Sequence, residues 1–149
     1  MKSIIDKIYE ATQDNTPIHR YVDVFIVADD KVLILQRANY MKRFGGCWGV
    51  VGGSIEKTDK DSRSAAIRET REETGIEIPY VVQTKMQHLD TVKHKDGSTS
   101  DFWVVRMDEI PDVKLSREHR RYTWFNADVK TVYKWMPDVF QAIQKILDD

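Results

Sequence analysis

The most informative segment of the chain runs from Gly52 to Ile76 and reads GGSIEKTDKDSRSAAIRETREETGI. Its last part, Arg68-Glu69-Thr70-Arg71-Glu72-Glu73-Thr74-Gly75-Ile76, predicts the end of a helix that we place from about Asp61 to Thr74. Asp61 or Ser62 is suited to cap the start of this helix, and Gly75 stands where a left-handed terminating residue is wanted.

The glutamates of this helix lie on one side of it. Residues three and four apart share a helix face, so Glu69, Glu72 and Glu73 should point into one arc. Like charges placed in this way repel by roughly 0.2–0.5 kcal/mol per pair on an exposed helix. A magnesium ion would offset the repulsion, because it prefers oxygen ligands and keeps water positions that substrate phosphates can take. The preceding Gly52 and Gly53 would let backbone carbonyls approach the same place.

Strand and helix patterns surround this stretch. β-branched and aromatic residues predict a buried strand at Tyr21–Ala28, and Asp29-Asp30 predicts a turn into a second strand at Val32–Gln36. Asp96-Gly97 is a strong turn dipeptide and predicts a hairpin. The other expected elements are helices at 4–12 and 138–147 and strands at 81–92, 102–107 and 122–125. Strands mixed with helices indicate an α/β domain whose helices cover a sheet.

Composition excludes several classes of protein. The chain has 149 residues, which suffices for one domain, and a net charge of −1. Long nucleic acid is not an expected partner, because phosphate binding usually needs a basic surplus. We expect no membrane partner, since no apolar run is long enough to span a bilayer and the N-terminus lacks a signal-peptide core. Cys47 is the single cysteine, which excludes an internal disulfide and fits a cytoplasmic protein.

The motif resembles the box of the Nudix hydrolase superfamily, whose MutT-like members share it. That box is a glycine, five residues, a glutamate, seven residues, and then Arg-Glu-aliphatic-x-Glu-Glu-x-Gly-aliphatic. The second half matches from Arg68 to Ile76, with Thr70 at the aliphatic position. Five residues after Gly53 stands Asp59 in place of glutamate, and the spacing to Arg68 is one residue longer than the pattern. Asp59 is therefore the candidate auxiliary carboxylate, with Glu56 as the alternative.

The resemblance covers roughly residues 20 to 126 and implies a fold and a mechanism. The fold is an α/β/α sandwich with a mixed β-sheet flanked by helices, here one domain over 1–149 with residues 1–19 as a helical extension. Mg²⁺, or Mn²⁺, would be the cofactor and would activate water against a phosphoanhydride bond. The implied metal-binding residues are Glu69, Glu72, Glu73, Gly52 and Asp59. The implied catalytic residues are Glu72 and Glu118, either of which could be the general base, and Arg68, which would orient the glutamates.

The substrate implied by the resemblance is a nucleoside diphosphate linked to another group. ADP-ribose, a dinucleoside polyphosphate and a nucleotide sugar are the classes we expect, and the sequence does not choose among them. Arg37 and Asn39 are the candidate substrate-binding residues, at the end of a predicted strand. Two alternatives stay open: a nucleoside triphosphate pyrophosphatase and a catalytically silent module that binds a nucleotide. Dimers are frequent in the family, which favours a homodimer.

Overall fold

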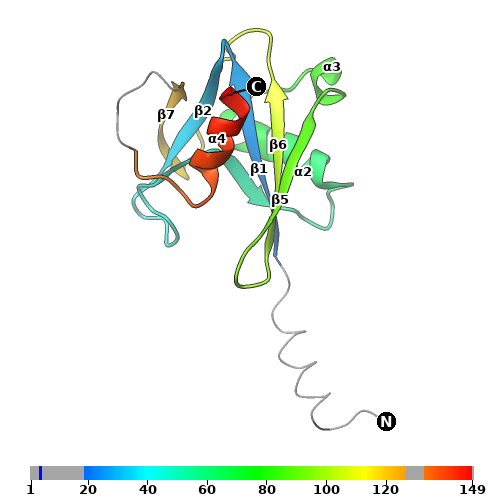
Figure 1. Cartoon of the computed structure of the whole chain (residues 1–149), viewed down its shortest axis with the longest axis vertical. Coiled ribbons are helices and arrows are strands. Elements are labelled where there is room, and N and C mark those ends of the chain that lie inside the picture. The colour runs from blue at the N-terminus through cyan, green and yellow to red at the C-terminus, as the bar shows by residue number, and fades with distance from the viewer. Residues whose placement is uncertain (1–3, 5–18, 127–132, 149) are drawn as a thin grey trace.

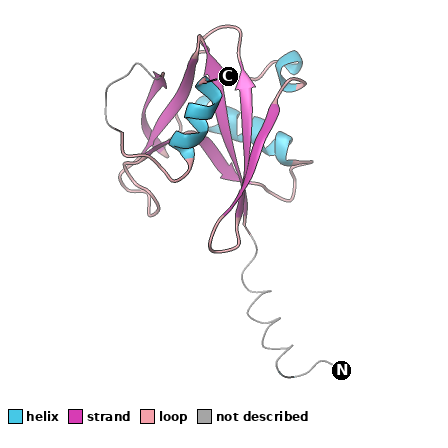
Figure 2. Ribbon diagram, in the orientation of Figure 1, coloured by secondary structure: helices cyan, strands magenta, loops and turns pink. Residues whose placement is uncertain are grey.

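The computed structural model describes residue 4, residues 19–126 and residues 133–148 of the chain. The strands are β1 (Arg20–Ala28), β2 (Lys31–Arg37), β3 (Trp48–Gly49), β4 (Val51–Ser54), β5 (Gln87–Lys93), β6 (Thr99–Arg106) and β7 (His119–Phe125). The helices are α2 (Ser62–Thr74), α3 (Tyr80–Gln83) and α4 (Val139–Leu147). Figure 1 shows α4 in front of the sheet and α2 behind it, and Figure 2 shows the same layers by type of element.

The sheet is mixed and is built around β1. One edge of β1 pairs in parallel with β6, which in turn forms an antiparallel hairpin with β5. The other edge is shared, because β2 pairs only with Val27 and Ala28 whereas β4 pairs with Tyr21 to Val24. β2 leaves β1 after this short contact and pairs with β3 and β7 instead. The sheet therefore divides into two arms, and the segment from β3 to β4 passes from one arm to the other.

Each face of the sheet carries its own core. Val22, Val24 and Ile26 of β1 pack on the α2 side, with Ala65 and Ala66 of the helix. Phe25 and Val27 alternate with them and pack on the α4 side. Because successive strand residues point to opposite faces, one apolar strand serves both cores. This arrangement is an α/β/α sandwich with a mixed sheet, which confirms the predicted fold class.

α2 begins and ends where the sequence predicts. The Asp61 side chain accepts a hydrogen bond from the backbone N–H of Ser64 at 2.7 Å, which is an N-cap. Gly75 has φ of 72° and donates its N–H to the carbonyl of Arg71, which closes the C-terminus. These two caps hold the glutamates of the helix in a fixed register relative to the strands.

One predicted strand is wrong in its first half. The segment expected as a strand from Val81 to Val92 begins with the short helix α3, and the strand β5 starts only at Gln87. Pro79 caps the helix, and Val82 and Met86 are buried in the core on the α2 side. The β-branched residues favoured a strand locally, but the N–H groups of Gln83 and Thr84 donate to the carbonyls of Pro79 and Tyr80, which closes a helical turn in place of a sheet ladder.

The other predicted elements in the described residues are confirmed. Asp29 and Asp30 have φ of 50° and 57°, which makes the tight turn between β1 and β2. Gly97, with φ of 89°, lies in the turn of the β5–β6 hairpin. The N-terminal helix falls outside the described residues except for Ile4, which is exposed. In the described part of the chain, no helix is long and apolar enough to cross a membrane.

Candidate active site

α2 presents two buried rows of side chains to the sheet. Ala66, Thr70 and Thr74 form one row, in which the Thr70 hydroxyl donates to the Ala66 carbonyl and the Thr74 hydroxyl to the Thr70 carbonyl. Glu69 and Glu73 form the other row and are 9% and 4% exposed. Helical spacing thus carries two carboxylates of the predicted cluster into the domain. Glu72, between them in sequence, is exposed.

The glycine pair of β4 makes room for these carboxylates. A Cβ atom on Gly53 would lie 2.2 Å from the carboxylate carbon of Glu69, so only glycine leaves that carboxylate in place. The backbone N–H of Gly52 donates to Oε2 of Glu73 at 3.1 Å. Both carboxylates therefore rest against the strand backbone. Gly52 meets the site through its N–H in this structure, and its expected role as a carbonyl ligand stays a prediction.

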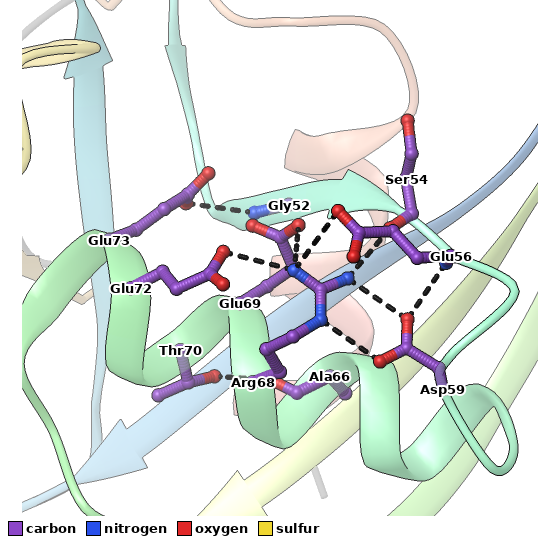
Figure 3. Close-up of polar contacts among 10 residues, drawn as sticks. All are labelled: Gly52, Ser54, Glu56, Asp59, Ala66, Arg68, Glu69, Thr70, Glu72 and Glu73. Carbon is purple, nitrogen blue, oxygen red and sulfur yellow. Dashed lines mark hydrogen bonds and ion pairs between the residues drawn. The ribbon is translucent and has the colours of Figure 1, made fainter.

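Arg68 is the centre of the polar contacts around the cluster (Figure 3). Its Nη1 donates to Oε1 of Glu69 at 3.0 Å and to Oε2 of Glu72 at 2.9 Å. Its Nη2 donates to the carbonyl of Ser54 at 2.9 Å, which ties the helix to the end of β4. A planar guanidinium can make these contacts together, whereas an ammonium group could not. The orienting role expected of Arg68 stays a prediction.

Asp59 is bound to Arg68 in a two-pronged ion pair. Arg68 Nε donates to Oδ1 at 2.9 Å and Nη2 to Oδ2 at 3.0 Å, and the N–H of Glu56 also donates to Oδ2 at 2.8 Å. The side chain of Asp is one methylene shorter than that of Glu. The box here is one residue longer than the family pattern, and this longer loop brings Asp59 within hydrogen-bond distance of Arg68. Glu56 is 58% exposed and lies 3.8 Å from Arg68. With both Asp59 oxygens hydrogen-bonded, its expected role as a metal ligand stays a prediction.

The buried glutamates are held at an electrostatic cost. Burial raises the pKa of Glu69 to about 7, against the opposing pull of Arg68 and with added repulsion from Glu72 and Glu118. Burial also raises the pKa of Glu73 well above its usual range, and repulsion from Glu69 and Glu118 adds to this shift. Carboxyl groups with such shifts in a functional cleft are typical of catalytic or metal-binding sites.

Glu118 reaches this cluster on a turn that other elements anchor. The N–H of Ser116 donates to the carbonyl of Glu73 at 3.0 Å, which ties the turn to the end of α2. The N–H of Ala38 donates to the carbonyl of Glu118 at 2.8 Å, which ties it to the end of β2. The structure thus brings Glu118, distant in sequence from the helix, to the box glutamates.

Arg37 faces the same cluster, and Asn39 does not contact it in the described structure. Arg37 lowers the pKa of Glu73, and its Nε donates to the carbonyl of Arg43 at 3.0 Å. Asn39 is exposed, and its Oδ1 would lie 3.1 Å from a Cβ atom on Gly46, so it packs against that turn. Arg37 is therefore placed to meet an anion at the carboxylates, whereas Asn39 lies on the loop beyond it.

Two buried titratable groups lie outside the predicted site residues, Asp23 on the α4 side of β1 and His119 at the start of β7. Asp23 pairs in register with Gly52, and burial together with the charge of Asp138 raises its pKa to about 7. Its signal was a charged residue inside an apolar strand. His119 is 7% exposed, and burial and the charge of Arg37 lower its pKa to about 4. Its Nδ1 has no hydrogen-bond partner among the described residues.

The donor set suits a hard divalent cation. Its members are carboxylate oxygens, the ligand type that magnesium and manganese prefer. Glu69, Glu73 and Glu118 repel one another, so a cation between them would relieve that repulsion. In the described residues, no three acidic, histidine or cysteine side chains are already arranged as a metal-binding group, and Glu69 and Glu72 bond to Arg68. Each of these two glutamates bonds to Arg68 through one carboxylate oxygen, which leaves its second oxygen for a cation.

The model of the NUDIX domain family matches residues 17–143 of this chain. The chain therefore belongs to the NUDIX domain family, as the resemblance of the box predicts.

Two mammalian proteins named as asymmetrical bis(5'-nucleosyl)-tetraphosphatases are similar in sequence. The rat protein (Rattus norvegicus) is 30% identical over 84 residues, which are 54% of this chain and 56% of the rat protein. The pig protein (Sus scrofa) is 29% identical over 116 residues, which are 76% of either chain. The match to the rat relative thus spans little more than half of that protein.

Two crystal structures share the fold at low sequence identity. One is the NUDIX domain of NrtR from Shewanella oneidensis in complex with ADP ribose, with a TM-score of 0.72 and 22% identity. The match covers 99% of this chain and 98% of the Shewanella chain. The bifunctional NMN adenylyltransferase/ADP ribose pyrophosphatase of Francisella tularensis, in complex with AMP and a Mn ion, has a TM-score of 0.75 and 20% identity. It covers 97% of this chain but 45% of the Francisella protein.

Proposed function

We propose that this protein is a metal-dependent pyrophosphohydrolase that cleaves a phosphoanhydride bond in a nucleoside diphosphate linked to another group. The observation that carries the proposal is the burial of Glu69 and Glu73 against a glycine strand and beside Glu118, with Glu69 bonded to Arg68. A merely solvated helix would not bury two like charges at such a cost. The family match and the relatives named for dinucleoside tetraphosphate and ADP ribose pyrophosphatase activity support the same reaction class.

In the proposed mechanism, Glu69, Glu72 and Glu73 hold Mg²⁺ or Mn²⁺, with Gly52 and Asp59 as further candidates. A divalent cation at this place would neutralise phosphate charge and make hydroxide available near neutral pH. Arg68 orients Glu69 and Glu72, since it hydrogen-bonds to both. Arg37 offers a cation to the phosphates, and Asn39 lines the approach from the neighbouring loop. In the reaction, the oxygen of water bonds to phosphorus, the anhydride P–O bond breaks, and the leaving phosphate oxygen keeps the electron pair.

Glu72 and Glu118 are both proposed as the general base. Glu72 is exposed and bonded to Arg68, so it can turn toward a water molecule once Arg68 releases it. Glu118 is also exposed and stands across the cluster on the anchored turn. A base must lie within hydrogen-bond reach of the attacking water, which either residue could satisfy by a side-chain rotation. Replacing each by glutamine separates them, because loss of the base lowers kcat more than KM.

The test is product release from a panel of substrates with and without Mg²⁺ and Mn²⁺. The panel contains ADP-ribose, dinucleoside polyphosphates, nucleotide sugars and nucleoside triphosphates. We expect metal-dependent cleavage of at least one class, and Glu72→Gln and Glu73→Gln should each remove most turnover while the protein stays folded. Cleavage of triphosphates alone would favour a triphosphate pyrophosphatase, and full activity of both variants would refute the site. No cleavage of any class with either metal would favour the silent nucleotide-binding module.

Three further properties belong to the proposal. We propose a single domain over residues 1–149, with residues 1–19 as an extension, since one family model matches residues 17–143. We propose a cytoplasmic protein and a homodimer, as the family resemblance and the single cysteine suggest. Light scattering of the full chain would give the oligomeric state.

A further inference from the structure

Basic side chains are concentrated on two segments beside the candidate site. Residues 37–47 and 114–121 carry seven Lys and Arg residues and a single acidic one, Glu118, in a chain whose net charge is −1. Arg121 turns to the other face of the sheet, where it bonds to Gln36 and lies over Trp48. The remaining six form what we call the basic rim: Arg37, Lys42, Arg43, Lys114, Arg117 and Arg120.

Hydrogen bonds tie the two segments of the basic rim together. The Tyr40 hydroxyl donates to the carbonyl of Arg117, and the N–H of Ala38 donates to the carbonyl of Glu118 at 2.8 Å. Arg37 and His119 are register partners where β2 pairs with β7. The six cations therefore belong to one surface that two distant parts of the sequence build together, and this surface keeps them near one another despite their like charge.

The basic rim borders the carboxylates at one end of α2. The N–H of Lys114 donates to the carbonyl of Thr74 at 2.8 Å, and Arg37 acts electrostatically on Glu73. Arg117 precedes Glu118, whose charge acts on Glu69 and Glu73. Arg68 with Asp59 and Ser54 occupies the other side of the cluster (Figure 3). A substrate bound at the carboxylates can therefore extend over the rim on one side only.

The basic rim has few acidic neighbours in the described part of the chain, where Arg37 acts electrostatically on Glu73 and Arg43 on Asp96. There, no acidic side chain forms an ion pair within 4.0 Å with any of the six, whereas Arg68 pairs with four carboxylates. All six except Arg37 are exposed. Clustered guanidinium and ammonium groups that form no ion pair with a carboxylate attract multiply charged anions and bind phosphate oxygens. A neutral sugar would leave these cations without a partner.

We propose that the basic rim binds phosphates beyond the two joined by the cleaved bond, so that the preferred substrate is a nucleotide with a bridge of three or more phosphates. This inference rests on the proposed function and narrows its substrate class. Lys42, Arg43 and Arg117 are then specificity-determining residues, because each added phosphate extends away from Glu69 and Glu73 and over these side chains. ADP-ribose and nucleotide sugars, which have two phosphates, would not reach them.

The experiment uses a series in which only the phosphate number changes. Diadenosine di-, tri-, tetra- and pentaphosphate are hydrolysed by the full chain with Mg²⁺ at constant ionic strength, and kcat/KM is measured for each. We expect kcat/KM to rise by roughly tenfold or more between the diphosphate and the tetraphosphate, as charge-assisted hydrogen bonds are added. Raising the salt concentration should reduce this ratio, because exposed charges are screened.

Two neutralising variants test the residues. Arg117→Gln and the double variant Lys42→Gln/Arg43→Gln should each lower the tetraphosphate-to-diphosphate ratio of kcat/KM by at least about fivefold. Arg106→Gln is the matched control, since Arg106 is exposed at the end of β6 and away from both segments, and it should keep the wild-type ratio. If kcat/KM did not change with phosphate number, or if both variants kept the wild-type ratio, this inference would be overturned but the proposed function would not. Absence of hydrolysis across the series and the wider panel would overturn the proposed function.

Discussion

Gly53 and Glu69 show how a single side chain of the candidate site is placed. The carboxylate of Glu69 fills the space where any other residue at position 53 would carry its Cβ atom. That carboxylate is the far end of a flexible side chain, so a substitution would move it at little cost to the fold. Gly53 therefore controls where the charge of Glu69 lies more than it controls stability.

Gly53→Ala should test this directly. We expect Glu69 to be displaced from β4, so that Mg²⁺ affinity and kcat/KM fall by about tenfold to a hundredfold, the range seen when groups that orient metal ligands are lost. The melting temperature should change little. Ser54→Ala is the control, because only the backbone carbonyl of Ser54 bonds to Arg68. Wild-type metal affinity in Gly53→Ala, measured by calorimetry, would show that Glu69 is not a ligand in its present position.

The Asp59–Arg68 pair is the second contact that can be tested at single residues. Both groups are mostly buried, with side-chain exposures of 6% and 16%. A double-mutant cycle with Asp59→Asn and Arg68→Lys should give a coupling energy of about 1–3 kcal/mol in urea unfolding. The same cycle with Glu56→Gln should give about 0.5 kcal/mol or less, because Glu56 is exposed and lies 3.8 Å from Arg68.

The same variants separate two roles for Asp59. If Asp59 acts through Arg68, Asp59→Asn should leave the Mg²⁺ dissociation constant within about threefold of wild type while stability falls. A much larger loss of Mg²⁺ affinity would instead support the predicted role of Asp59 as a metal ligand.

At the scale of elements, α2 joins the core to the site through its two buried rows. The row of Ala66, Thr70 and Thr74 packs without charge, and the row of Glu69 and Glu73 faces the glycines of β4. Thr70 occupies the aliphatic position of the box and satisfies its hydroxyl on the carbonyl of Ala66. Thr70 therefore departs from the family pattern without leaving its buried hydroxyl unbonded.

Thr70→Val and Thr74→Val should differ in their effect on stability. The Thr70 hydroxyl only adds a bond to a helix carbonyl, so Thr70→Val should change the free energy of unfolding by about 0.5 kcal/mol or less. The Thr74 hydroxyl also accepts the buried N–H of Ile76 at 3.2 Å, so Thr74→Val should cost about 1–2 kcal/mol. Urea unfolding of both variants measures the difference. Equal losses would mean that the Thr74 hydroxyl does not stabilise the end of α2.

At the scale of the whole molecule, the sheet decides which distant segments meet. β2 leaves β1 after two register pairs and carries Arg37 toward β7, while β4 takes its place beside β1 and carries the glycines. Glu118 then reaches the cluster from the turn before β7. The candidate site therefore draws on three separate parts of the chain, and charges that repel are brought together by strand pairing and packing.

This accumulation of buried carboxyls should appear in the pH dependence of stability. The pKa of Glu69 is about 7 in the metal-free fold against 4.5 for the ordinary group. Between these values the unfolded chain releases this proton while the folded protein keeps it, so Glu69 makes the free energy of unfolding fall as pH rises from about 4.5 to about 7. We expect Glu69→Gln to melt at a progressively higher temperature relative to wild type across this window in EDTA.

Saturating Mg²⁺ should reduce the difference in melting temperature between Glu69→Gln and wild type, because a bound cation stabilises the ionised carboxylate. Asp23→Asn is the comparison, since the pKa of Asp23 is also raised to about 7 but Asp23 is outside the proposed metal ligands. Its pH dependence should not respond to Mg²⁺. Parallel melting curves of wild type and Glu69→Gln would contradict the raised pKa of Glu69.

Much of this protein is determined by its sequence alone. Local signals sufficed for α2, since Asp61 and Gly75 act on the backbone next to them, and for the turn at Asp29-Asp30. The spacing of Glu69 and Glu73 also placed them on one helix face, because helix geometry repeats. Tertiary structure decided the rest. α3 formed where a strand was predicted, with Val82 packed in the core. The loop after β4 placed Asp59 against Arg68, and the register of β2 and β7 placed His119 beside Arg37. These outcomes depend on which elements pack together, and that information is not local to any stretch of the chain.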